Sequence, residues 1–158
     1  MFNHRKTFSK ELFDKHDQFA KDVVLSLMKA LKYELTDDTE AYGSHDFIVA
    51  KDGKEYKVEV EQKMGWKFDE FPFSTHDVSC RKRTSKADYF FQVNARGTAV
   101  MMCPMSMVTS SPVVRKNTKF GTMNEPFFAV PTDLVRYFFY TDGIWEEDHI
   151  ISDSSSSA

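Results

Sequence analysis

Hydrophobic and polar residues follow two different periods along the first part of this chain. From residue 9 to residue 33, apolar side chains recur at spacings of three, four and seven, the period of one face of an α-helix. The members of this stripe are Leu12, Phe19, Ala20, Val23, Val24, Leu27, Met28 and Leu31. The pattern predicts a long first helix from about Ser9 to Tyr33, with Thr7 or Ser9 capping its start.

The period then changes to two, which is typical of β-strands. Residues 42–50 end in the apolar run F-I-V-A, and residues 55–63 alternate between apolar and charged side chains. The K-D-G-K between them contains the Asp-Gly pair that favours a tight turn. We therefore predict a hairpin in which Glu59, Glu61 and Lys63 share one face of the second strand.

Shorter patterns divide the rest of the chain. They predict a basic helix or loop at 76–86, strands at 89–94 and 98–103, a loop at 104–126, a strand at 127–130 and a closing helix at 133–140. This order of elements predicts an α/β fold in which helices flank a mixed central sheet. We expect one domain over residues 1–150 and a disordered Ser-rich tail at 151–158.

Composition excludes several classes of protein. Of the 158 residues, 41% are hydrophobic and 28% are charged, which excludes a disordered or collagen-like chain. The longest apolar run, residues 99–105, is far shorter than the roughly 18 residues of a membrane span, and the N-terminus lacks the hydrophobic stretch of a signal peptide. Cys80 and Cys103 are too few for a disulfide framework, so we expect them to be core thiols of a cytoplasmic protein.

Charge is distributed unevenly. The net charge is −3, yet residues 78–124 hold eight bases and one acid, a net charge of +7. Such a block in an acidic protein predicts a face for a polyanion, with a solvated surface as the alternative. The candidate nucleic-acid contacts are Lys67, Arg81, Lys82, Arg83, Lys86, Arg115, Lys116 and Lys119.

The predicted hairpin also gathers candidate catalytic groups. Asp46 lies in the first strand, and Glu61 and Lys63 lie near the end of the second, so Asp46 can approach Glu61. Two close carboxylates repel each other unless a cation lies between them, and oxygen ligands suit Mg²⁺ or Mn²⁺. The pattern predicts metal-assisted phosphodiester hydrolysis, with the lysine orienting water or stabilising negative charge.

One further acid near this site has two interpretations. Glu59 shares the face of Glu61, and is either a supporting carboxylate of the site or a surface acid. The competing interpretation of E-x-E-x-K as a whole is a solvated strand face with cross-strand ion pairs.

Asp46 followed by Glu61-Gln62-Lys63 on the next strand resembles the signature of the PD-(D/E)XK nuclease superfamily. The order of helix, strand, strand with E-x-K, helix and strand is similar to that family's core over roughly residues 9–103, although His45 replaces the proline of the motif. The M-G-W after the lysine is similar to phage-type Holliday-junction resolvases.

The resemblance implies a restriction-endonuclease-like core and a function. It implies a Mg²⁺- or Mn²⁺-dependent endonuclease for double-stranded or branched DNA, a homodimer, encoded by a phage or mobile element. Its catalytic residues would be Asp46, Glu61 and Lys63, and its metal ligands would be Asp46, Glu61, Glu59 and Asp17. Many such enzymes place an acid of the first helix near the metal, for which Asp17 and Glu11 are the candidates, with an ordinary surface acid as the alternative for either. Resolvase, restriction, homing and repair roles remain open, as does an RNA-directed nuclease. The alternative from a different class is a non-catalytic nucleic-acid-binding or assembly protein on the same fold.

Overall fold

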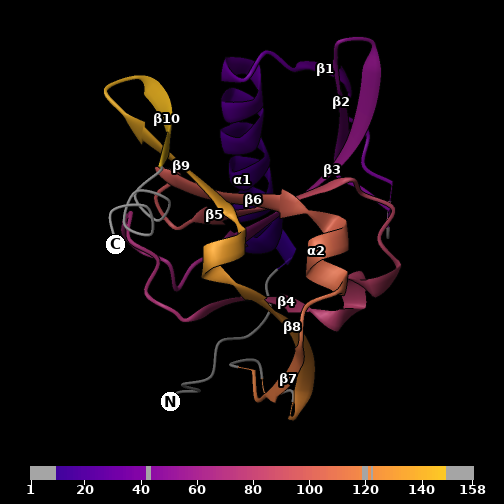
Figure 1. Cartoon of the computed structure of the whole chain (residues 1–158), viewed down its shortest axis with the longest axis vertical. Coiled ribbons are helices and arrows are strands. Elements are labelled where there is room, and N and C mark those ends of the chain that lie inside the picture. The colour runs from indigo at the N-terminus through magenta and orange to yellow at the C-terminus, as the bar shows by residue number, and fades with distance from the viewer. Residues whose placement is uncertain (1–9, 42–43, 119–120, 122, 149–158) are drawn as a thin grey trace.

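The computed structural model describes residues 10–41, 44–118, 121 and 123–148, with the side chains of residues 10–14 excepted. Within these residues the chain forms two α-helices, two short 3-10 helices and ten strands (Figure 1). The helices are α1 (Lys10–Ala30), η1 (Cys80–Thr84), α2 (Met105–Thr109) and η2 (Thr132–Leu134). The strands are β1 (Glu34–Asp37), β2 (Phe47–Lys51), β3 (Lys54–Lys63), β4 (Thr75–Ser79), β5 (Tyr89–Asn94), β6 (Ala99–Pro104), β7 (Val113–Lys116), β8 (Glu125–Pro131), β9 (Arg136–Thr141) and β10 (Ile144–Asp148).

Several sequence predictions lie outside the described residues. They concern the helix caps Thr7 and Ser9, the side chain of Glu11, the basic Lys119 and the tail at 151–158.

The strands form two sheets, and the larger one is mixed, as predicted. Its order is β1-β2-β3-β5-β6-β9-β10, and neighbouring strands are antiparallel except for the parallel pair β3 and β5. The smaller sheet has the order β4-β8-β7. A parallel pair needs a crossover connection, and the segment with β4 and η1 provides it.

The large sheet is covered on both faces (Figure 1). Helix α1 packs on one face through an apolar core that includes Val24, Leu27 and Phe91. The small sheet and α2 pack on the other face, where Phe90 belongs to a second core. Adjacent residues of β5 thus enter different cores, as the alternation of side chains along a strand requires. The chain is therefore a mixed α/β protein in three layers.

The strongly periodic segments fold as predicted. Helix α1 and β5 lie within the expected ranges, and β3 begins one residue earlier than expected, at Lys54. At the hairpin turn, Asp52 and Gly53 have φ values of 52° and 77°, the paired positive values of a two-residue type I′ turn. Both cysteines are buried free thiols. None of the helices in the described part of the chain is long and apolar enough to cross a membrane.

The predicted closing helix at 133–140 is wrong. A three-residue 3-10 helix, η2, precedes β9 instead. The aromatic run R-Y-F-F-Y favours a strand, and β9 pairs with β6 so that Tyr137 and Phe138 enter the cores on opposite faces of the sheet. A strand can place these two adjacent side chains in cores on opposite faces of the sheet, whereas the predicted helix cannot.

Other predicted boundaries also change. The predicted basic helix or loop at 76–86 begins as β4, whose burial alternates, and continues as η1. The predicted loop at 104–126 contains α2 and β7. The edge strands β1 and β10 were not predicted; all four residues of β1 are exposed, so its sequence carries no period of two.

Candidate active site

Asp46 immediately precedes β2, at the point where that strand stops pairing with β3. Its backbone N–H donates to the carbonyl of Val58 at 2.8 Å. Its carboxylate Oδ2 accepts from the backbone N–H of Val60 at 2.7 Å, and the residue is only 8% exposed. The carboxylate therefore accepts a hydrogen bond from the backbone of β3 in place of the backbone of a further β2 residue.

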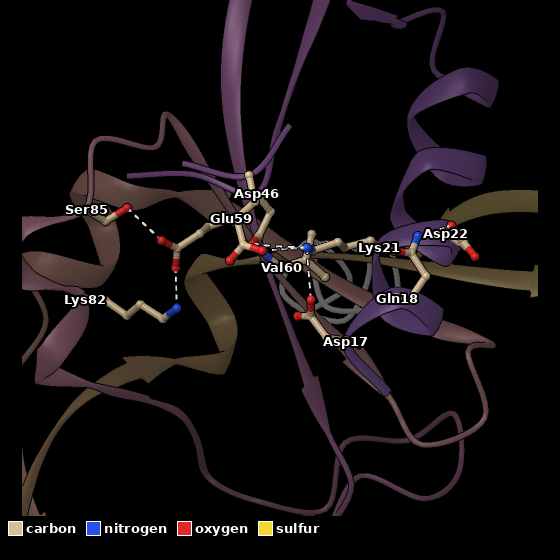
Figure 2. A network of polar contacts seen from close by, with 10 residues as sticks. Asp17, Gln18, Lys21, Asp22, Asp46, Glu59, Val60, Lys82 and Ser85 are labelled. Carbon is tan, nitrogen blue, oxygen red and sulfur yellow. Dashed lines mark hydrogen bonds and ion pairs between the residues drawn. The ribbon is translucent and has the colours of Figure 1, made fainter. Parts of the chain in front are cut away.

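Glu59 is the acid of β3 whose charge acts on Asp46. The pairing of β2 with β3 ends at Phe47 and Val58, the residues next to these two acids. Glu59 is 6% exposed; its Oε1 accepts from the Ser85 hydroxyl at 3.1 Å (Figure 2). The interpretation of Glu59 as a surface acid is therefore wrong.

Glu61 lies two residues further along β3, on the same face as Glu59. It is half-buried, and its Oε1 accepts from the Gln92 side-chain amide at 2.8 Å. We call Asp46, Glu59 and Glu61 the carboxylate cluster. Because Glu59 is buried and Glu61 is half-buried and hydrogen-bonded, E-x-E is not a solvated strand face.

A lysine that the motif did not identify meets this cluster. Lys82 of η1 forms an ion pair with Glu59 at 2.5 Å (Figure 2). Burial alone would lower the pKa of Lys82, but the charges of Glu59, Glu61 and Asp46 outweigh burial and raise it. Lys63, the lysine of the predicted motif, places its ammonium 5.4 Å from the ring centre of Phe73, and its charge lowers the pKa of Glu61.

A second lysine links the cluster to α1. Lys21 lies 3.7 Å from Asp46 and 2.9 Å from Asp17 (Figure 2). It also lies 3.4 Å from Glu40. Asp17, predicted as a metal ligand, thus approaches the cluster with this ammonium as its ion-pair partner. The spacing of Asp17 and Lys21, four residues on a helix, is the one sequence signal for this pair.

Burial raises the pKa of Asp46 to about 6. The hydrogen bond from Val60 and the charge of Lys21 lower it, whereas the charges of Glu59 and Asp17 raise it further. Burial also raises the pKa of the third member, Glu61, against the opposing charge of Lys82. Asp46 and Glu61 therefore bind protons more readily than ordinary carboxylates do.

The raised pKa of Asp46 should appear in the pH dependence of folding. Folded Asp46 holds its proton up to about pH 6, whereas the ordinary value is 3.8, so the free energy of unfolding should fall as pH rises through this window. A difference of about 2 pKa units corresponds to roughly 3 kcal/mol.

Asp46→Asn cannot ionise at this position and should lack this decline in the free energy of unfolding, whereas the exposed control Asp133→Asn should retain it. Chemical denaturation at intervals from pH 4 to pH 7 without divalent cations measures the difference; identical slopes for all three proteins would contradict it.

The chemistry of the cluster fits a hard divalent cation, although its present charge balance does not require one. Carboxylate oxygens are the ligands that Mg²⁺ and Mn²⁺ prefer. Among the side chains that the structure describes, no three of His, Cys, Asp or Glu are grouped so that they could hold a metal ion. Because the ammonium of Lys82 supplies the positive charge at Glu59, a divalent ion would have to displace it.

The structure brings two of the predicted basic residues to acids of the small sheet. Arg81 of η1 pairs with Glu125 of β8 at 3.3 Å, and Lys116 of β7 lies opposite Glu125 in the small sheet. Lys116 also forms an ion pair with Asp77 of β4. The bases Arg81, Arg83, Lys86, Arg115 and Lys116 are all exposed, and we call this set the basic surface. Lys67 is exposed on the segment after β3, and Lys82 is turned inward.

Lys21, Ser85 and Gln92 contact the cluster and were not predicted from the sequence. Ser85 and Gln92 come from segments more than 20 residues beyond Glu59, so local spacing could not identify them. No family model, curated protein or solved structure matches this chain.

Proposed function

We propose that this protein is a Mg²⁺- or Mn²⁺-dependent endonuclease that hydrolyses phosphodiester bonds of double-stranded or branched DNA. The observation that supports this best is the carboxylate cluster, three acids gathered around one lysine beside an exposed basic surface. Gathering like charges in a partly buried place costs stability. Perturbed carboxylates of this kind are typical of functional sites.

The arrangement of strands also supports a restriction-endonuclease-like core. Asp46 precedes β2 and the other acids lie in the antiparallel strand β3, which is followed by the parallel strand β5. This is similar to the PD-(D/E)XK order, with two differences. The acid of β3 whose charge acts on Asp46 is Glu59, and a second lysine, Lys82 of η1, joins Lys63 at the acids.

The chemistry assigned to each group follows from its charge. A divalent ion would need Lys82 to move from Glu59 and the carboxylates of Asp46, Glu59 and Glu61 to come together. Once held there, it would polarise the phosphoryl oxygen and lower the pKa of the attacking water. Lys82 would then stabilise the negative charge that develops on the phosphoryl group. The basic surface would hold the phosphate backbone without reading its sequence, and a homodimer of the protein would present two such sites.

A non-catalytic nucleic-acid-binding protein on the same fold is the second candidate. One observation favours it: the ion pair between Lys82 and Glu59 neutralises part of the cluster without any metal. Binding DNA through the basic surface requires no gathered carboxylates, so this candidate leaves the cluster as a purely structural feature.

A cleavage assay separates the two candidates. Supercoiled, linear, single-stranded and branched DNA, and RNA as a separate substrate, are incubated with the protein and Mg²⁺, Mn²⁺, Ca²⁺ or EDTA. We expect nicking or cutting with Mg²⁺ or Mn²⁺ and none with EDTA. Binding without cleavage under every condition would favour the non-catalytic candidate, and cleavage of RNA alone would change the substrate class.

Removing charges from the basic surface should weaken DNA binding without regard to sequence. The triple variant Arg81→Ala, Arg83→Ala, Lys86→Ala should reduce the slope of log affinity against log salt by about 0.9 for each phosphate that the protein no longer neutralises. The fold should persist, because the side chain of Arg81 is 79% exposed and exposed ion pairs contribute at most about 1 kcal/mol. Fluorescence anisotropy at several salt concentrations measures the slope. An unchanged slope would place DNA elsewhere.

A further inference from the structure

A chain of buried polar side chains leads from Glu61 into the interface between the two sheets. Gln92 of β5 and His76 of β4 are completely buried, and Tyr137 of β9 is 7% exposed. Gln92 Nε2 lies 2.8 Å from Glu61 Oε1, Gln92 Oε1 lies 2.7 Å from His76 Nδ1, and His76 Nε2 lies 2.7 Å from the Tyr137 hydroxyl. Because a buried polar group is costly unless it is paired, these contacts are mutually dependent.

The direction of each hydrogen bond follows from the Gln92 amide. Its Nε2 has two acceptors, Glu61 Oε1 and the carbonyl of Asp77 at 3.2 Å. The side-chain oxygen of Gln92 therefore faces His76. Because this oxygen can only accept a hydrogen bond, Nδ1 of His76 must carry a proton. Burial lowers the pKa of His76 to about 4, so the ring is neutral at pH 7 and its Nε2 accepts from the Tyr137 hydroxyl.

Aromatic packing fixes the imidazole in this orientation. The ring of Phe71 stacks on His76 with centroids 3.6 Å apart and an interplanar angle of 17°. The indole of Trp66 meets the imidazole edge-on, with centroids 5.7 Å apart. Trp66 and Phe71, two aromatic residues that follow β3, thus hold the histidine in place.

We propose that the one-way chain Tyr137–His76–Gln92 positions the carboxylate of Glu61, with Gln92 and His76 as positioning residues of the cluster. Every donor points toward Glu61, so the chain cannot reverse without unpairing a buried group. Fixing one oxygen of Glu61 sets the orientation in which the carboxylate meets a cation. The role toward a metal rests on the proposed function, whereas the hydrogen-bond direction does not.

The tautomer of His76 tests the direction of the chain without any assay of activity. In ¹⁵N-labelled wild-type protein at pH 7, we expect the Nδ1 resonance at the position of a protonated nitrogen and Nε2 at that of a bare one. This tautomer is opposite to the one that predominates for histidine in water. A protonated Nε2, whether with or without a proton on Nδ1, would overturn the chain.

Metal binding tests the positioning role. Gln92→Met removes the donor to Glu61, and we expect it to weaken Mn²⁺ binding by about 10–100-fold, the usual loss when a partner of a metal ligand is removed. Tyr137→Phe is the milder variant, because His76 keeps its bond to Gln92, and should have a smaller effect in the same direction. The control Tyr89→Phe removes a hydroxyl on the α1 face of the sheet and should have none. Electron paramagnetic resonance of unbound Mn²⁺ measures each affinity.

The outcomes separate this inference from the proposed function. A protonated Nδ1 together with weaker Mn²⁺ binding in Gln92→Met supports the inference. Equal Mn²⁺ affinity in the wild type and Gln92→Met would overturn the positioning role even if DNA is cleaved. Absence of Mn²⁺ binding to the wild type would overturn the metal-dependent function, and with it the role toward a metal, whatever the tautomer. If Gln92→Met does not fold, Tyr137→Phe against Tyr89→Phe gives the same comparison.

Discussion

Glu61→Gln is expected to abolish metal-dependent DNA cleavage while DNA binding persists or tightens. The glutamine retains a side-chain oxygen that can accept from Gln92 as Glu61 does at 2.8 Å, so the local hydrogen bond is preserved. The variant loses one negative charge from the cluster, which weakens metal binding and also reduces the repulsion of phosphate. Because losing a partner of a metal ligand costs roughly 10–100-fold, losing a ligand itself should cost at least about 100-fold in turnover.

Glu55→Gln is the matched control for this prediction. Glu55 belongs to the same strand and has the same side-chain parity as Glu61, but it is exposed at the other end of β3. Cleavage of supercoiled DNA with Mg²⁺ and DNA affinity with Ca²⁺ are measured for both variants. Wild-type turnover in Glu61→Gln would mean that the E-x-K segment is a structural feature only. Equal losses in both variants would point to the charge of β3 as a whole.

The fold was predictable where one side of a segment is buried and the other is exposed, or where apolar residues recur at a regular spacing. Helix α1 has one apolar stripe, and the turn at Asp52 and Gly53 has the residues that a type I′ turn requires. Strand β9 was not predictable in this way, because its aromatic residues are buried on both faces and have neither a helical nor a strand period. Its identity depends on pairing with β6, more than 30 residues earlier in the chain.

The placement of the candidate acids on two adjacent strands was predictable from the sequence, but their partners were not. The short turn at Asp52 and Gly53 joins β2 to β3, so Asp46 and the acids of β3 come from one hairpin. The acid whose charge acts on Asp46 is Glu59, and not the predicted Glu61.

The identity of the lysine at the site depended on long-range packing. Lys63 shares a strand with the acids, which made it the natural candidate. Lys82 was singled out for its charge, as a phosphate contact, but the crossover through β4 and η1 turns its ammonium toward Glu59. No spacing along the chain encodes that turn, because it is produced by the pairing of β4 with β8 in the small sheet.

Lys82→Met should destabilise the protein in the absence of divalent cations and make it more responsive to them. Removing one partner of a buried ion pair costs roughly 3–5 kcal/mol. The side chain of Lys82 is 31% exposed and that of Glu59 is 8% exposed, so we expect a smaller loss of about 2 kcal/mol at pH 7. The loss should shrink toward pH 5, because the raised pKa of Asp46, about 6, lets this carboxylate take up a proton.

Divalent cations should reverse this loss. Without the ammonium, three carboxylates repel one another, and Mg²⁺ or Mn²⁺ no longer has to displace a lysine. A ligand that binds only the folded state stabilises it by about 2.7 kcal/mol at 100 times its Kd, so the rise of Tm with Mn²⁺ should be larger in Lys82→Met than in the wild type. Arg81→Met removes a charge from the same 3-10 helix, where the pair with Glu125 is exposed on the arginine side, and should change stability by under about 1 kcal/mol. Thermal unfolding with Mn²⁺ and with EDTA measures both effects.

The same variant also separates two roles for Lys82. If Lys82→Met binds Mn²⁺ more tightly yet does not cleave DNA, the ammonium is needed for stabilising charge on the phosphoryl group. If it binds more tightly and cleaves as the wild type does, the ammonium only occupies the cation position when no metal is bound. An unchanged response to Mn²⁺ together with unchanged stability would contradict both roles, because neither the ion pair with Glu59 nor the cluster would then act as a cation site.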